Sequence, residues 1–374
     1  MKFQSQTVGN KTHGIAKLHE AGRLDAADGS VDDALAALET DAVRVAPTMN
    51  PQNVANTMGA FSKLGRMPSD KTWAALETAA GRVAREMSPQ NVANTMWAFS
   101  KLEVMPDDKT WAALETAAGR VARDMNPQNV TNVMFTYATL GIVPNDMTRA
   151  ALNTAAGRVA RDMNSQELAN TLWASATLFT LRDVEHPPCY AAMWDLVCRL
   201  QASEFSDESL RMLFHVYLMH HFSSSSGSVK VAYPAWLMVD ARDAWMHNVR
   251  DGITMSRSHR ALASVIGDLG IRHEVERVTG DGCFSMDIYL PEYDVAVEFE
   301  GPSHYYHSSA SSSSRDASRM LRTAKTELRD CLLAKQCAKV VTVPWFEWRD
   351  TGSTPERRRA YVREKLAKEA GIEG

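Results

Sequence analysis

The chain has 374 residues, of which 45% are hydrophobic and 23% are charged, and its formal net charge is −4. This composition excludes a disordered chain, and the length suits two domains. No apolar run is long enough for a membrane-spanning helix, so we expect a soluble protein without a membrane partner. A slightly acidic protein does not coat nucleic acid by bulk charge, so any such binding must use local patches.

The first 29 residues carry little structural signal. They begin with a basic stretch that lacks an apolar signal-peptide core, so residues 1–29 are predicted to be a disordered or targeting tail. Five cysteines without a CxxC spacing favour a reducing compartment over a disulfide framework.

An internal repeat of 38 residues dominates the next part of the chain. The unit at 50–87 recurs at 88–125 with only six substitutions, recurs less closely at 126–163 and decays from residue 164. Each unit predicts two helices with apolar stripes, such as Val54, Met58 and Phe61 on the first. One helix pair cannot bury its own stripe, so residues 30–222 are predicted to stack as an α-solenoid of about five pairs, caps included.

A polar stripe recurs on the first helix of each unit, opposite the apolar one. Repeat proteins that read single-stranded RNA present polar side chains at fixed helix positions, about one base per repeat. We therefore predict RNA binding here, with an ordinary solvated surface as the alternative. The predicted set is Asn56, Lys63, Asn94, Lys101, Asn132 and Asn170.

The second helices carry Arg82, Arg120 and Arg158 in register, and each of these arginines has an acid four residues later. The arginines could follow RNA phosphates. An ion pair on the helix surface is the favoured interpretation, because side chains four residues apart are neighbours on a helix.

A change of pattern marks the end of the repeats. The serine run "SSSSGS" predicts a linker, and residues 223–255 are assigned to this linker and a connecting helix. Residues 256–374 then follow the order helix, three strands, basic helix, strand and closing helix, which predicts a small α/β domain. The strands are expected at 273–278, 284–290, 295–300 and 339–345, and the basic helix at about 316–335.

Carboxylates mark two of these strands. With a hairpin loop centred between residues 292 and 293, the apolar residues share one face and Asp287 lies opposite Glu298, with Glu300 one step further. Like charges facing across a hairpin are destabilising unless a cation, a shared proton or solvent offsets them. We predict an Mg²⁺ or Mn²⁺ site at Asp287, Glu298 and Glu300, with His304 nearby. A solvated sheet face is the alternative.

The basic helix is a second candidate for RNA contact. Its cations recur at helical spacing and could steer a phosphate backbone toward the carboxylates, although a solvated face remains an open alternative. These residues are Arg315, Arg319, Arg322, Lys325 and Arg329.

The segment from about 256 to 368 resembles a RAP domain through "MDIYLPEYDVAVEFEGPSHY" and "VPWFEW", in that order. RAP domains occur in organellar RNA-metabolism proteins and resemble the restriction-endonuclease-like fold of very-short-patch-repair nucleases. The resemblance implies Asp287 and Glu298 as metal ligands, Glu300 in place of the usual aspartate and His304 after Gly-Pro. Lys325 would replace the lysine that many such nucleases carry two residues after the first glutamate. The 38-residue units are similar to octotricopeptide-type repeats.

These observations predict an α-solenoid of helical-hairpin repeats followed by a small α/β restriction-endonuclease-like domain. The leading hypothesis is a protein of a mitochondrion or chloroplast that binds single-stranded RNA and aids its processing, maturation or stability, with ribosomal or RNA-processing proteins as further partners. One alternative is a metal-dependent endonuclease, whose catalytic residues would be Asp287, Glu298, Glu300, His304 and Lys325. The other is a protein-interaction scaffold.

Overall fold

The computed structural model describes residues 5–21, 29–223, 230–252, 255–308, 320–352 and 354–372. The chain forms two compact units. The first comprises Met1–Leu200, Lys230–Ala232 and Tyr306–Asp316, and the second comprises Gln201–Val229, Tyr233–Tyr305 and Ala317–Gly374. Within the described residues, no helix combines the length and apolar character needed to cross a bilayer. The five cysteines are free.

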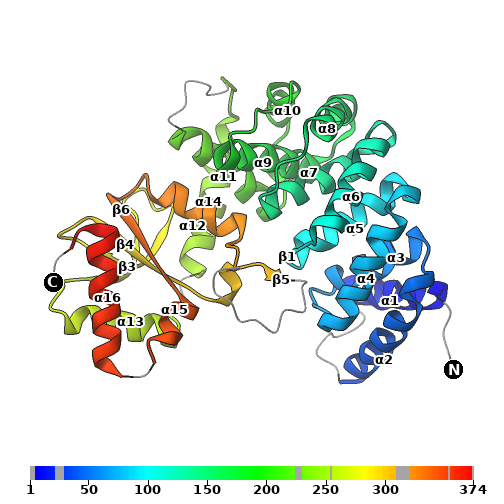
Figure 1. Ribbon diagram of the computed structural model, residues 1–374. Helices are drawn as coiled ribbons and strands as arrows, with labels where there is room; N and C mark the ends of the chain where they lie inside the picture. Colours follow the sequence, from blue (N-terminus) through cyan, green and yellow to red (C-terminus); the bar gives the residue numbers. More distant parts are fainter. Residues whose placement is uncertain are drawn as a thin grey trace. The chain divides into compact units, whose positions relative to one another are not determined.

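The first unit stacks five helix pairs among its described residues (Figure 1). Successive first helices pack against one another, and so do the second helices from α2 to α8, which confirms the predicted solenoid. The first helices are α1 (Ser5–Glu20), α3 (Pro51–Lys63), α5 (Pro89–Lys101), α7 (Pro127–Leu140) and α9 (Ser165–Arg182). The second helices are α2 (Gly29–Val45), α4 (Asp70–Val83), α6 (Asp108–Val121), α8 (Asp146–Val159) and α10 (Tyr190–Val197). Short 3-10 turns follow α2, α4, α6 and α8, namely η1 (Ala46–Thr48), η2 (Ala84–Glu86), η3 (Ala122–Asp124) and η4 (Ala160–Asp162).

The first helices begin at equivalent caps. The side chain of Asn50, Ser88, Asn126 or Asn164 accepts a hydrogen bond from the backbone N–H three residues later. In three of the four repeats that begin at residues 50, 88, 126 and 164, a proline occupies the first helical position, where its missing N–H costs nothing. These caps fix where each unit starts, so the following polar positions align between units.

The recurring arginines of the second helices join each 38-residue repeat to the repeat before it. Arg120 Nη2 donates to the carbonyl of Met87 at 2.7 Å, and Arg82 Nη2 donates to the carbonyl of Met49 at the same distance. Arg158 repeats the contact with Met125. The predicted surface pairing with an acid four residues later is therefore wrong. The guanidinium instead satisfies carbonyls at the end of the preceding unit.

A glutamate provides a second link at each of these interfaces. Its carboxylate accepts a hydrogen bond from the backbone N–H at the start of the next second helix, at 2.8 Å in all three cases. The pairs are Glu39 with Ser69, Glu77 with Asp107, and Glu115 with Asn145. One cationic and one anionic link per interface hold the units in register.

Two boundaries differ from the prediction. Part of the expected N-terminal tail forms α1, which packs on α3 because Val8, Thr12 and Ala16 recur every four residues and are buried. α11 (Asp207–Phe222), which resembles a last half unit of the solenoid, belongs to the second unit. Residues 224–229 of the serine run lie outside the described residues.

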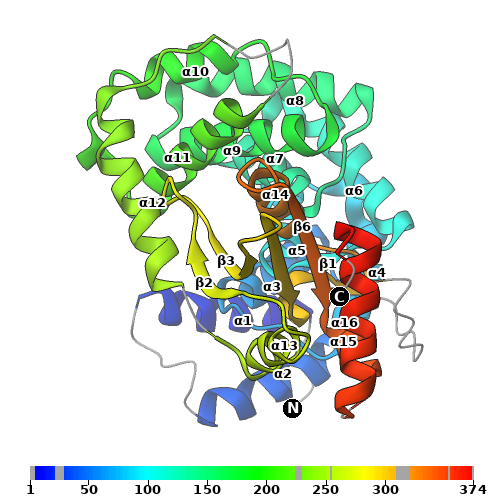
Figure 2. The same ribbon diagram turned by 90° about the vertical axis from the view of Figure 1, so that its left-hand side faces the viewer.

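The second unit is built around a four-stranded sheet of order β2-β3-β4-β6 (Figure 2). β4 and β6 are parallel, whereas β2, β3 and β4 are antiparallel neighbours. The strands are β2 (Glu274–Val278), β3 (Ser285–Leu290), β4 (Val295–Glu300) and β6 (Lys339–Pro344). The helices are α11, α12 (Asp240–Asp251), α13 (Arg257–Asp268), α14 (Ala324–Leu333), α15 (Trp345–Asp350) and α16 (Pro355–Ala370). Short 3-10 turns are η5 (Ala202–Glu204), η6 (Ala235–Met238) and η7 (Pro302–His304). A separate two-stranded ladder in the first unit pairs β1 (Val104–Met105) with β5 (His307–Ser308). The order from α13 to β6 confirms the predicted helix, three strands, helix and strand.

The hairpin of β3 and β4 has the predicted register. Ile288 pairs with Val297 and Leu290 pairs with Val295, and all four side chains are buried in one core with α13 and α16. Figure 1 shows these two helices on one side of the sheet and α14 on the other. The opposite pleat, which carries Asp287, therefore faces away from this core.

The basic helix is shorter than predicted. α14 begins at Ala324, because the side chain of Thr323 caps it by accepting from the N–H of Thr326 at 3.2 Å. Arg322 precedes the helix and forms an isolated β-bridge with Tyr305. Two of the predicted contact residues, Arg315 and Arg319, lie outside the described residues.

Candidate functional site

A groove runs along the first helices of the solenoid, from α1 to α9, and encloses about 500 Å³. The four predicted asparagines line it together, one from each of α3, α5, α7 and α9, and each is half-buried. Glutamines four residues before three of them line the same groove. These residues are Asn56, Asn94, Asn132 and Asn170, with Gln90, Gln128 and Gln166. The 38-residue period thus produces a continuous row of amides.

Two lysines and one carboxylate line the groove among the described residues. Lys17 of α1 and Lys63 of α3 are the cations, Glu167 of α9 is the carboxylate, and the imidazole of His13 of α1 also lies along it. The Glu167 carboxylate accepts the backbone N–H of Asn164 at 2.8 Å and so caps its own helix. An anionic polymer fits this balance better than a cationic one.

Trp97 is a groove residue that the sequence interpretation missed. It lines the groove beside Asn94 and is half-buried, and Lys101 Nζ lies 5.7 Å from its ring centroid. The signal was present in the repeat register, because Gly59, Phe135 and Trp173 occupy the equivalent position in the other units.

A second candidate site lies on the sheet of the second unit. Asp287 and Glu298 are side by side on β3 and β4, as predicted. The N–H of Asp287 donates to Glu298 Oε1 at 3.2 Å, and the N–H of Phe299 donates to Asp287 Oδ2 at 2.8 Å. Glu298 and Glu300 are buried rather than solvated.

An arginine offsets the charge of Glu298. Arg329 of α14 places Nη1 2.7 Å from Glu298 Oε2, and its Nη2 donates to the carbonyl of Ser285 at 2.6 Å. Burial raises the pKa of Glu298, and nearby Asp287 raises it further, whereas Arg329 lowers it. The cation expected opposite Asp287 and Glu298 is thus a guanidinium of the chain itself.

A second arginine serves Glu300. Arg322 forms ion pairs with Glu300 and with Asp330 of α14, and the hydroxyl of Tyr305 donates to Glu300. Both predicted RNA contacts in this segment, Arg322 and Arg329, are therefore engaged inside the domain. Removing either would leave a buried carboxylate without its ion pair.

The other two predicted catalytic residues differ in their placement, since Lys325 is exposed whereas His304 lies near Glu300. Lys325 is exposed on α14 and, among the described residues, forms no ion pair with the carboxylates. Arg329, one turn later on α14, is the residue that forms the ion pair with Glu298. His304 follows β4 in η7, where burial lowers its pKa and Glu300 raises it.

A cluster with metal-ligand chemistry does include Asp287, but with different partners. The ligand atoms of His259, Glu276 and Asp287 lie within 4.8 Å of one another. His259 Nε2 lies 2.8 Å from the carbonyl of Asp287 and must donate to it, which leaves Nδ1 facing Glu276 Oε1 at 3.2 Å. Metal-binding histidines commonly donate their second nitrogen to a carbonyl in this way. Glu276 also has a φ of 52°, an uncommon conformation for a non-glycine residue.

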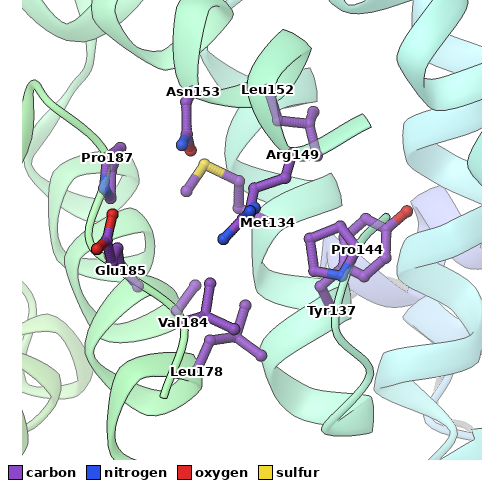
Figure 3. Close-up of a pocket in the computed structure, with 12 residues that line it drawn as sticks. Met134, Tyr137, Pro144, Arg149, Leu152, Asn153, Leu178, Val184, Glu185 and Pro187 are labelled. Atoms are coloured by element: carbon purple, nitrogen blue, oxygen red, sulfur yellow. The ribbon is translucent and has the colours of Figure 1, made fainter. Parts of the chain in front are cut away.

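A small apolar pocket in the solenoid is a poor candidate. It lies between α7, α8 and α9 and is lined by residues such as Met134, Leu152 and Leu178 (Figure 3). Its cavity volume of about 30 Å³ is far below the roughly 300 Å³ of typical ligand sites.

Comparison with known proteins agrees with this architecture. Residues 297–365 match the family model of the RAP domain, so the chain carries a RAP domain, and this supports nucleic-acid binding in general terms. Residues 42–58, 79–96 and 152–172 match a family described as "Protein of unknown function (DUF1601)". Each of these matches spans the end of one second helix and the start of the next first helix. No curated protein matches the chain.

Proposed function

We propose that the protein binds single-stranded RNA in the groove of its solenoid. The observation that supports this proposal most directly is the alignment of Asn56, Asn94, Asn132 and Asn170 along one groove. An amide both donates and accepts hydrogen bonds and can therefore recognise the edge of an unpaired base. The RAP domain then aids processing, maturation or stability of the bound RNA.

The charge of the groove favours RNA over a basic peptide. Lys17 and Lys63 line it, and Lys101 lies beside Trp97. In a chain with a net charge of −4, a local cationic surface attracts phosphates, whereas a basic peptide would be repelled. The scaffold hypothesis therefore becomes the outcome that remains if RNA does not bind.

A charge-matched pair of variants tests the groove. Lys63→Ala with Lys101→Ala should weaken the affinity for an unstructured RNA oligomer about tenfold and reduce the slope of log affinity against log salt by roughly 1.4, because about 0.7 is lost per phosphate contact. Lys71→Ala with Lys109→Ala removes the same charge from exposed positions on α4 and α6 and serves as the control. Fluorescence anisotropy at several salt concentrations measures both. Equal losses in the two variants would argue against the groove.

The RAP domain also supports the proposal that this RNA belongs to a mitochondrion or chloroplast, with ribosomal or RNA-processing proteins as partners. A fluorescent fusion of the whole chain should then colocalise with one of these organelles. A signal spread through the cytosol would contradict this part of the proposal and leave the RNA-binding part intact.

A second candidate function is a metal-dependent endonuclease, and the cluster of His259, Glu276 and Asp287 favours it. One imidazole and two carboxylates fit Mn²⁺ or Mg²⁺. A bound ion would activate water and stabilise charge at a phosphodiester. Glu298 and Glu300, which were predicted as ligands, are instead paired with arginines.

Metal binding can be measured without any nuclease assay. Mn²⁺ titration followed by electron paramagnetic resonance should show one site in the whole protein, and Asp287→Asn should abolish it. RNA cleavage that requires the metal and disappears in the same variant would establish the endonuclease. Full binding of Mn²⁺ by Asp287→Asn would exclude this cluster.

A further inference from the structure

One groove position differs between units that are otherwise nearly identical. α3 and α5 have the same sequence over all 13 residues except at one place, where α3 has Gly59 and α5 has Trp97. The repeats that begin at residues 126 and 164 have Phe135 and Trp173 at this position. The chain therefore contains its own comparison between a helix with an aromatic side chain in the groove and the same helix without it.

The aromatic side chains at this position are used differently. Trp173 is 9% exposed and packs against Phe135, with ring centroids 5.2 Å apart. Trp97 is half-buried, lines the groove beside Gln90 and Asn94, and makes no ring-to-ring contact among the described residues. The ring of Trp97 thus remains accessible from the groove.

Trp97 also has the neighbours that a nucleotide requires. Asn94 offers an amide three residues before it, and Lys101 Nζ lies 5.7 Å from the ring centroid. An indole provides a flat surface for a base of any sequence, an amide can bond to the base edge, and an ammonium can pair with the adjoining phosphate.

We propose that Trp97 is a stacking platform for one base of single-stranded RNA, so that the repeat at 88–125 holds its nucleotide more tightly than the repeat at 50–87. The inference rests on the proposed RNA-binding function and adds a residue that determines affinity. In the repeat at 50–87, Gly59 leaves the equivalent place open, since a Cβ added there meets no atom within 4 Å.

This asymmetry allows a gain-of-function test. Gly59→Trp makes α3 identical to α5, and Trp97→Gly makes α5 identical to α3. We expect Trp97→Gly to weaken the affinity for an unstructured RNA oligomer about tenfold and Gly59→Trp to strengthen it by a similar factor, because each change removes or adds one base-to-aromatic stack. The swap variant that carries both changes should return close to the wild-type affinity. Trp97→Phe should retain most of the binding.

An abasic sugar-phosphate oligomer separates stacking from charge. Wild type, Trp97→Gly and Gly59→Trp should bind it with equal affinity, because it has no bases, and the salt dependence for ordinary RNA should be the same in all three. Thermal unfolding of each variant checks that the fold is kept. A glycine inside an exposed helix weakens that helix, so Trp97→Ala serves if Trp97→Gly is unfolded.

The outcomes separate the two proposals. If wild type binds RNA but neither Trp97→Gly nor Gly59→Trp changes its affinity by more than twofold, Trp97 is not a stacking platform and the groove proposal stands. If the abasic oligomer responds to the substitutions as RNA does, the effect is not stacking and the inference also fails. If wild type binds an extended peptide and no RNA, both proposals fail.

Discussion

Arg329 explains how the carboxylate of Glu298 can be buried on the sheet opposite the half-buried carboxylate of Asp287. The alternation of apolar and acidic residues predicted that Asp287 lies opposite Glu298, and the predicted register of the apolar pairs is confirmed. The alternation could not show which cation offsets the charge, because Arg329 comes from a helix that follows in the chain. His259 and Glu276 were missed because they lie on α13 and β2, outside the hairpin whose alternation was analysed.

Loss of Arg329 should be costly. Arg329→Gln leaves the Glu298 carboxylate buried without its ion pair, so we expect the free energy of unfolding to fall by about 3 kcal/mol. Lys325→Gln, one turn earlier at an exposed position, should change it by less than about 0.5 kcal/mol. Urea unfolding measures both. Adding Glu298→Gln to Arg329→Gln should recover part of the lost stability, because the buried charge is then removed. Similar small losses in Arg329→Gln and Lys325→Gln would show that the ion pair contributes little to stability.

His220 should make stability depend on pH. Its Nδ1 lies 2.7 Å from the hydroxyl of Tyr233, and burial lowers the pKa of His220 to about 4. Between about pH 6.5 and pH 4 the unfolded chain binds this proton and the folded chain does not. Stability is therefore lost as the pH falls through this range, by about 2 kcal/mol at pH 5.

The measurement compares urea midpoints at pH 7 and pH 5 in wild type and His220→Asn. The substitution removes the titrating group, so the difference in stability between the two pH values should be smaller in the variant. An unchanged difference would assign the pH dependence to other groups.

At the scale of the element, the repeat itself carried most of the predictive information. The apolar stripes predicted the two helices of each repeat, and the structure contains them. The basic helix was misplaced, because spacing of arginines alone suggested a start near residue 316. Thr323 was the overlooked N-cap, and a cap is a better guide to a helix start than a run of charges.

The links between units could not be predicted from one helix. Arg120 was expected to pair with an acid on its own helix, but it donates to a carbonyl 33 residues earlier. Such a contact depends on how two units stack, and no pattern within one unit reports it. Glu77 and Glu115 form their links across the same kind of interface.

Arg120→Leu should loosen one of these interfaces. Loss of the charged hydrogen bond to the Met87 carbonyl should lower the free energy of unfolding by about 1.5 to 3 kcal/mol. Arg123→Leu is the matched control, since the Arg123 side chain is 86% exposed and, within the part of the chain that the structure describes, its one ion pair is with Asp124. Guanidinium unfolding followed by circular dichroism measures both. Equal effects in the two variants would mean that the contact does not stabilise the stack.

For the whole molecule, the two architectures and their order were predicted correctly, but the assignment of α11 was not. An apolar stripe on α11 fits either unit, and local periodicity does not identify which surface covers it. The groove followed from the repeat, because equivalent positions in stacked units must form a row. The use of Arg322 and Arg329 within the domain did not follow, since it depends on long-range contacts.

The proposed function requires RNA to lie along the first helices of the solenoid. Ultraviolet crosslinking of the whole protein to an unstructured RNA oligomer, followed by mass spectrometry, locates the contact directly. We predict crosslinked peptides from α3, α5, α7 and α9, with Trp97 among the modified residues. Crosslinks confined to the second helices, or none at RNA concentrations that saturate binding, would contradict the account.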